Sequence, residues 1–178
     1  LKPAKLRRNR SYRRPKGRRF RARISNFSDA RSTDVNWDLP SPYTYDIEVQ
    51  ASDIDGMGHA NNACYVLWCE ACAWKHSEEL GLSVSDYQAL DRGVAIHKAS
   101  YAYFLPSFEG ERLIAGTWLT ACDNKLRLER RFQVLNSETG DTVLRGHWQL
   151  ICVALSSGKA CRLPQEFIQV YGGAVIDN

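Results

Sequence analysis

Residues 53–74 read DIDGMGHANNACYVLWCEACAW, and this stretch decides the fold that we expect. Its first part combines glycines with acidic residues, which is typical of a loop. The following asparagine pair offers a helix cap before a long apolar block, so a helix should begin near Asn62. It should run to about Leu80, because Gly81 stands where a cap glycine would end it. Apolar residues occupy all its faces, which predicts a helix buried on every side.

The segments on either side of this helix have the two-residue period of strands. Residues 43–51 alternate apolar and polar side chains, as a half-buried strand does. After Gly93, apolar runs alternate with turn signals. These runs predict strands at 94–105, 113–121, 125–135 and 143–155. A short helix is expected before that glycine, near residues 85–90. The expected fold is therefore α+β, with a five-stranded antiparallel sheet wrapped around a long central helix.

The charges divide the chain into two regions. Residues 1–23 carry twelve Lys and Arg and no acid, whereas the remaining residues carry twelve bases and twenty acids. We expect a basic, disordered arm over residues 1–36 and a globular domain over residues 37–178. Such an arm suits RNA, DNA or another anionic surface. A fragment or a misplaced start is the alternative interpretation, because Met57 is the only methionine.

The cysteines and the hydropathy favour a cytoplasmic protein. No apolar run approaches the roughly 18 residues of a membrane span, and no apolar signal segment is found. We therefore expect free thiols. The spacing of Cys69 and Cys72 invites a metal interpretation, but no second pair follows at zinc spacing. We expect both to be small hydrophobic residues of a packed helix, with no metal and no cofactor.

The loop before the central helix carries the candidate chemistry. The pattern Asp53-x-Asp55-x-x-Gly58-His59-x-Asn61-Asn62-x-x-Tyr65 occupies residues 53–65. It places a carboxylate beside flexible glycines at a helix N-terminus. Unpaired backbone N–H groups and the helix dipole favour developing negative charge there. This combination suits acyl transfer.

The same pattern resembles the signature of the 4-hydroxybenzoyl-CoA thioesterase-like hot-dog family, including its long-chain acyl-CoA thioesterase branch with G-H-x-N-N. Residues 103–113, YFLPSFEGERL, are similar to the family's Y-x-x-P-x-x-x-G-D/E-x-L pattern. The resemblance covers about residues 42–170. It implies the hot-dog fold, an acyl-CoA substrate, and a homodimer or homotetramer with each site between subunits.

The resemblance also implies roles for the loop residues. Asp55 falls on the catalytic carboxylate, either as general base on water or as nucleophile giving an acyl-aspartyl anhydride. Backbone N–H groups at the helix start would polarise the thioester carbonyl. His59 either assists catalysis or shapes the loop, and Asn62 either faces the site or caps the helix. Asp53 is expected to shape the turn.

Further residues are candidates for substrate binding. Tyr65 either packs in the core or touches substrate. Glu70, the one acid expected inside the buried helix, needs a partner or a function, and a catalytic role is its alternative. Cationic side chains on the strands suit the CoA phosphates, although solvated strand faces explain them equally well. The binding candidates are Gly58, Asn61, Tyr65, Glu70, Lys98, Arg127 and Arg130, with Lys125 and Arg131 as further cations.

Two other classes of function stay open at this stage. A hot-dog dehydratase or hydratase shares the fold, but its D-x-N-P-x-H signature differs from residues 55–59. A non-catalytic protein that senses acyl-CoA or associates with nucleic acid would use the pocket for ligand and the basic arm for the polymer. The acyl chain length, an aryl preference and the choice between CoA and a carrier protein are not fixed by the sequence.

Overall fold

The computed structural model describes residues 36–176. The expected basic arm, residues 1–36, lies outside this range except for Asn36, and so does any contact of that arm with nucleic acid. The elements in chain order are β1 (Tyr43–Glu48), a 3-10 helix (Ala51–Asp53), α1 (Asn62–Glu79), α2 (Val84–Ala89), β2 (Arg92–Tyr103), β3 (Arg112–Cys122), β4 (Arg127–Asn136), β5 (Thr142–Ala154) and α3 (Gln165–Gly173).

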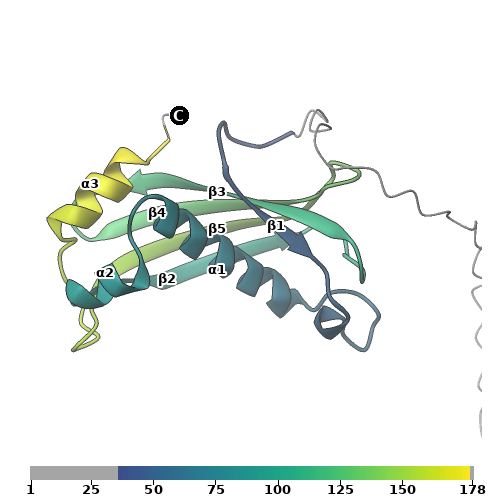
Figure 1. Cartoon of the computed structure of the whole chain (residues 1–178), viewed down its shortest axis with the longest axis horizontal. Coiled ribbons are helices and arrows are strands. Elements are labelled where there is room, and N and C mark those ends of the chain that lie inside the picture. Colours follow the sequence, from purple (N-terminus) through teal and green to yellow (C-terminus); the bar gives the residue numbers. More distant parts are fainter. Residues whose placement is uncertain (1–35, 177–178) are drawn as a thin grey trace, which may run out of the picture. The chain divides into compact units, whose positions relative to one another are not determined.

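The strands form one antiparallel sheet in the order β1-β3-β4-β5-β2. The long helix α1 lies along one face of this sheet, and α2 and α3 lie toward the same end of it (Figure 1). The expected five-stranded sheet and long helix are confirmed, with strand bounds within about three residues of the prediction. Helix α3 is an element that the sequence analysis did not predict.

Helix α1 begins and ends where its capping residues place it. The Asn61 side chain accepts a hydrogen bond from the Ala63 N–H at 2.9 Å, so Asn61 is the N-cap and Asn62 the first helical residue. At the other end Gly81 has a φ of +90°, a conformation that favours glycine. The N–H of Leu82 then reaches the Ser77 carbonyl oxygen at 2.8 Å, which closes a Schellman motif.

The sheet covers only one side of α1, so the prediction of a helix buried on every side is wrong for the single chain. Tyr65, Cys69 and Cys72 point into the core and are almost fully buried. Leu67 on the opposite side is 60% exposed, and Glu70 is exposed as well. The five strands cover one face of α1, and no other described element covers its remaining apolar side.

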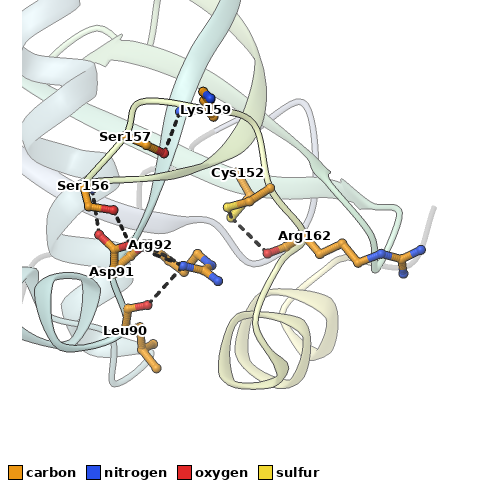
Figure 2. A network of polar contacts seen from close by, with 9 residues as sticks. Leu90, Asp91, Arg92, Cys152, Ser156, Ser157, Lys159 and Arg162 are labelled. Carbon is orange, nitrogen blue, oxygen red and sulfur yellow. Dashed lines mark hydrogen bonds and ion pairs between the residues drawn. The ribbon is translucent and has the colours of Figure 1, made fainter.

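The start of β2 is held against the chain that follows β5, and Figure 2 shows the contacts. The Asp91 carboxylate accepts hydrogen bonds from the Ser156 backbone N–H and hydroxyl, both at 2.7 Å. The Arg92 guanidinium donates to the Asp91 carbonyl oxygen at 2.9 Å. These contacts fix the strand pair at the end of the sheet that carries α2.

All six cysteines are free thiols in the structure. Cys69 and Cys72 are fully buried, and burial raises the pKa of Cys72 to about 12. Both therefore act as small hydrophobic residues, as predicted. Within residues 36–176, no group of His, Cys, Asp and Glu side chains has the arrangement of a metal site. None of the described helices is long and apolar enough to cross a membrane.

Candidate functional site

The loop between the 3-10 helix and α1 presents the Asp55 carboxylate at the start of α1. Backbone hydrogen bonds close the loop: the Asp55 N–H donates to the His59 carbonyl oxygen and the Gly58 N–H to the Asp55 carbonyl oxygen, both at 3.0 Å. Gly58 has a φ of +86°, which a residue with a Cβ rarely adopts. The loop conformation therefore depends on this glycine.

Only part of the Asp55 carboxylate is used within the loop. Its Oδ1 accepts a hydrogen bond from the Met57 N–H at 2.8 Å. Its Oδ2 lies 3.9 Å from Nδ1 of His59, too far for a hydrogen bond. Both side chains are half-buried, with 27% of Asp55 and 33% of His59 exposed. Among residues 36–176 the carboxylate is thus oriented by one hydrogen bond, and its Oδ2 accepts none.

Asp53 has the structural role that the sequence predicts. Its Oδ2 accepts a hydrogen bond from the Gln50 N–H at 2.8 Å, and its carbonyl oxygen accepts one from the Asn61 N–H at 2.8 Å. These two bonds join the end of the strand region to the helix cap. Asp53 therefore shapes the turn that carries Asp55.

The two sequence motifs lie side by side in the structure. The Ser107 carbonyl oxygen accepts a hydrogen bond from the Ala60 N–H at 2.8 Å. The Tyr103 hydroxyl donates to the Asn62 carbonyl oxygen at 3.3 Å. Tyr65 is 2% exposed and packs edge-on against Tyr103, with ring centroids 5.7 Å apart, so it belongs to the core. Residues 103–113 thus support the loop and the first turn of α1.

Several backbone N–H groups near Asp55 have no hydrogen-bond partner among the described residues. Most of the loop N–H groups are used inside the loop and the helix cap. Those without a partner in residues 36–176 are the N–H groups of Gly56, His59 and Asn62. Unpaired donors at a helix N-terminus are suited to an oxygen that gains negative charge.

The two asparagines at the start of α1 should contribute differently to the stability of the fold. Asn61→Ala removes the side chain that accepts the Ala63 N–H, so we expect the free energy of unfolding to fall by about 1 kcal/mol. Asn62→Ala removes an exposed side chain that accepts no backbone N–H among residues 36–176, and stability should stay within about 0.5 kcal/mol. Urea unfolding of the two variants measures both values. Equal losses would contradict the assignment of the cap to Asn61, for which the sequence offered both asparagines.

The other predicted binding residues are distributed away from the loop. A cavity of about 110 Å³ lies between the second half of α1 and the sheet, and both Glu70 and Arg130 line it. Asp55 and His59 line neither this cavity nor a second one on the sheet near Arg145. The exposed side chains of Lys98 and Arg127 lie on β2 and β4.

Two expectations for these residues are corrected by the structure. Glu70 is exposed in the single chain, so the argument that a buried acid needs a partner does not apply to it. Arg130 is only 4% exposed and points into the core, which does not suit contact with CoA phosphates at the surface. The cavity also contains polar groups that the sequence analysis did not single out, namely Ser77, Tyr87 and Tyr171.

A long helix on one face of a five-stranded antiparallel sheet, with the Asp55 loop at its start, is the hot-dog architecture. Residues 49–170 match the profile of the thioesterase-like superfamily, which is more than half of the chain. The protein belongs to this superfamily. The fold and family that the sequence predicts are thereby confirmed. Comparison with curated protein sequences gave no significant match.

Solved structures with the same fold include several thioesterases. A 1,4-dihydroxy-2-naphthoyl-CoA thioesterase from Synechocystis is similar at 22% identity and a TM-score of 0.67, over 74% of this chain and 96% of that one. A DHNA-CoA thioesterase from Staphylococcus aureus has 22% identity and a TM-score of 0.67, over 73% and 88%. A 12:0-ACP thioesterase from Umbellularia californica has 15% identity and a TM-score of 0.68, over 76% and 54%.

Proposed function

We propose that the protein hydrolyses acyl-CoA thioesters to the free acid and CoA, with Asp55 as its catalytic carboxylate. The observation that carries this proposal is the placement of Asp55 at the N-terminus of α1, with Oδ2 available and unpaired N–H groups nearby. Membership in the thioesterase-like superfamily supports the reaction class.

The geometry is compatible with two versions of the reaction. As a general base, Asp55 takes a proton from water while the water oxygen attacks the thioester carbonyl carbon. As a nucleophile, its Oδ2 attacks that carbon and forms an anhydride that water then hydrolyses. In both versions the carbonyl oxygen gains negative charge, which the N–H groups of His59 and Asn62 would stabilise. The CoA sulfur leaves as thiolate and takes up a proton.

We further propose that the site is completed by a second copy of the chain. Large apolar side chains near the loop are exposed in the single chain, including Met57, Phe104 and Phe108. Strand β2 pairs on one edge only, with β5, among the described strands. Exposed apolar side chains beside a free strand edge favour an interface between subunits.

The free thiols of all six cysteines support the expected cytoplasmic location.

A panel of acyl-CoA substrates tests the reaction and the substrate class together. Short, long and aromatic acyl-CoAs, with lauroyl-carrier protein as a further member, are scored by release of free thiol. The solved structures named for aromatic-CoA and 12:0-ACP substrates motivate these members. Thiol release from at least one member is expected. Binding of an acyl-CoA without thiol release would favour the non-catalytic sensing function instead.

A further inference from the structure

The cavity under α1 has one charged group at its inner side and one near its rim. Its polar lining consists of Glu70 and Ser77 from α1, Arg130 from β4, and the tyrosines of α2 and α3. Glu70 is exposed and Arg130 is almost completely buried. The remaining lining is apolar and includes Trp74 and Trp148. The cavity therefore presents a buried cation in largely apolar surroundings.

The charge of Arg130 is not balanced by a carboxylate in the described part of the chain. No ion pair of residues 36–176 involves it, and its hydrogen bonds within that range use only one nitrogen, Nη1. Nη1 lies 3.0 Å from Nδ1 of His76 and 3.3 Å from the Thr117 hydroxyl. Burial and the neighbouring Arg130 lower the pKa of His76 to about 4, so the ring is a neutral acceptor at pH 7. Both partners of the guanidinium are thus uncharged.

The hydroxyl groups of the cavity already use their protons among themselves. The Ser77 hydroxyl donates to the Ala73 carbonyl oxygen at 3.1 Å, and the Tyr171 hydroxyl donates to the Ser77 oxygen at 3.0 Å. The Tyr87 hydroxyl pairs with that of Tyr171, and it must be the donor because the Tyr171 proton is in use. Within the described lining, Arg130 is consequently the charged group that keeps donors for a ligand.

We propose that this cavity binds the carboxylate of a small organic acid or acyl group, with the Arg130 guanidinium as its partner. Burying a cation without a counter-charge is costly, and a planar carboxylate matches the fork of guanidinium donors. Such a ligand supplies the missing charge, and its hydrocarbon part contacts the apolar lining. An apolar ligand would leave the guanidinium without a counter-charge.

The volume of the cavity limits the size of the ligand. An apolar cavity of about 150 Å³ accommodates benzene, so about 110 Å³ suits roughly four to five non-hydrogen atoms. A two- or three-carbon carboxylate, with about four or five non-hydrogen atoms, is of this size. Two sources share this chemistry: a free organic acid, and the far end of an acyl group that carries a terminal carboxylate.

Tryptophan fluorescence provides a direct test with free acids, because Trp74 and Trp148 line the cavity. The full chain is titrated with acetate and propanoate, and with the neutral amides acetamide and propanamide. We expect saturable fluorescence changes with the acids and at least tenfold weaker binding of the amides. Equal binding of acids and amides, or no binding of either, overturns the proposal.

Substitutions then assign the binding to Arg130. Arg130→Met should abolish carboxylate binding, and Arg130→Lys should weaken it, because lysine keeps the charge but loses the fork. Arg112→Met, at an exposed arginine of β3, is the matched control and should bind as the parent chain does. Thermal unfolding followed by circular dichroism shows whether each variant is folded. Unchanged binding in a folded Arg130→Met variant also overturns the proposal.

A second arm distinguishes the two sources, and this arm alone rests on the proposed thioesterase activity. Thiol release is compared for succinyl-CoA and butanoyl-CoA, which differ in the terminal carboxylate. A preference for succinyl-CoA that Arg130→Met reverses by tenfold or more assigns the cavity to the acyl group. Carboxylate binding without such a preference assigns it to a free acid. If no thioester is cleaved while the acids still bind, the proposed function fails and the cavity assignment holds.

Discussion

Asp55→Asn should lower thioester turnover by two orders of magnitude or more while the fold stays intact. Asparagine has the same shape, and its side-chain oxygen can still accept the Met57 N–H that now binds Oδ1. It cannot take a proton from water or act as a carboxylate nucleophile. A hundredfold loss corresponds to about 2.7 kcal/mol of transition-state stabilisation. Steady-state thiol release measures the loss, and thermal unfolding followed by circular dichroism monitors the fold.

Two further variants make this experiment specific. Asp46→Asn, at an exposed position of β1, changes the same functional group without touching the loop and should retain full activity. Glu70→Gln tests the alternative carboxylate on α1. If Asp55→Asn keeps its activity and Glu70→Gln loses it, the catalytic carboxylate is Glu70 and the proposed role of Asp55 is refuted.

The parts of the fold that could be predicted from the sequence are those with strong local patterns. The alternation in residues 43–51 predicted β1, and Gly81 predicted the end of α1, because a positive φ at a helix terminus selects glycine. The predicted start of the helix at Asn62 is confirmed, but the sequence left the cap open between Asn61 and Asn62. Adjacent asparagines offer the same chemistry, and only the hydrogen bond to Ala63 distinguishes them.

Helix α3 could not be predicted because its stability comes from distant residues. It is short, ends in two glycines and contains β-branched residues, all of which weaken a helix signal. Phe167 packs against Tyr87 of α2, with ring centroids 4.6 Å apart, and Tyr171 pairs with the same tyrosine. These contacts join residues about eighty positions apart in sequence, which no local pattern reveals.

The position of Arg130 was available from the sequence but was not inferred. Leu128 and Phe132 flank it at two-residue spacing on β4, and both are buried, so the strand period places Arg130 on the inner face. The cluster of arginines in residues 127–131 suggested a phosphate site instead. By contrast, the exposure of one apolar side of α1 could not be predicted from the sequence. An apolar helix face has the same residue pattern whether a sheet or another subunit covers it.

The parent chain should lose stability as the pH falls from about 6.5 toward 4, and His76 should account for part of that loss. Burial and Arg130 lower the pKa of His76 from 6.5 to about 4 in the folded chain. Between these values the unfolded chain binds a proton that the folded chain does not, so acidification favours unfolding. Because the ring is not fully buried, we expect a contribution on the order of 1 kcal/mol between pH 7 and pH 5.

Urea unfolding at pH 7, 6 and 5 measures this contribution as the difference between the parent chain and His76→Gln. Glutamine carries no titratable group, and its side-chain oxygen is an acceptor for the Arg130 Nη1 in place of the imidazole nitrogen. The variant should therefore have a shallower fall in stability over this range. His97→Gln, at an exposed position of β2, is the matched control and should follow the parent chain. Parallel pH profiles for His76→Gln and the parent chain would contradict a neutral, half-buried His76 beside Arg130.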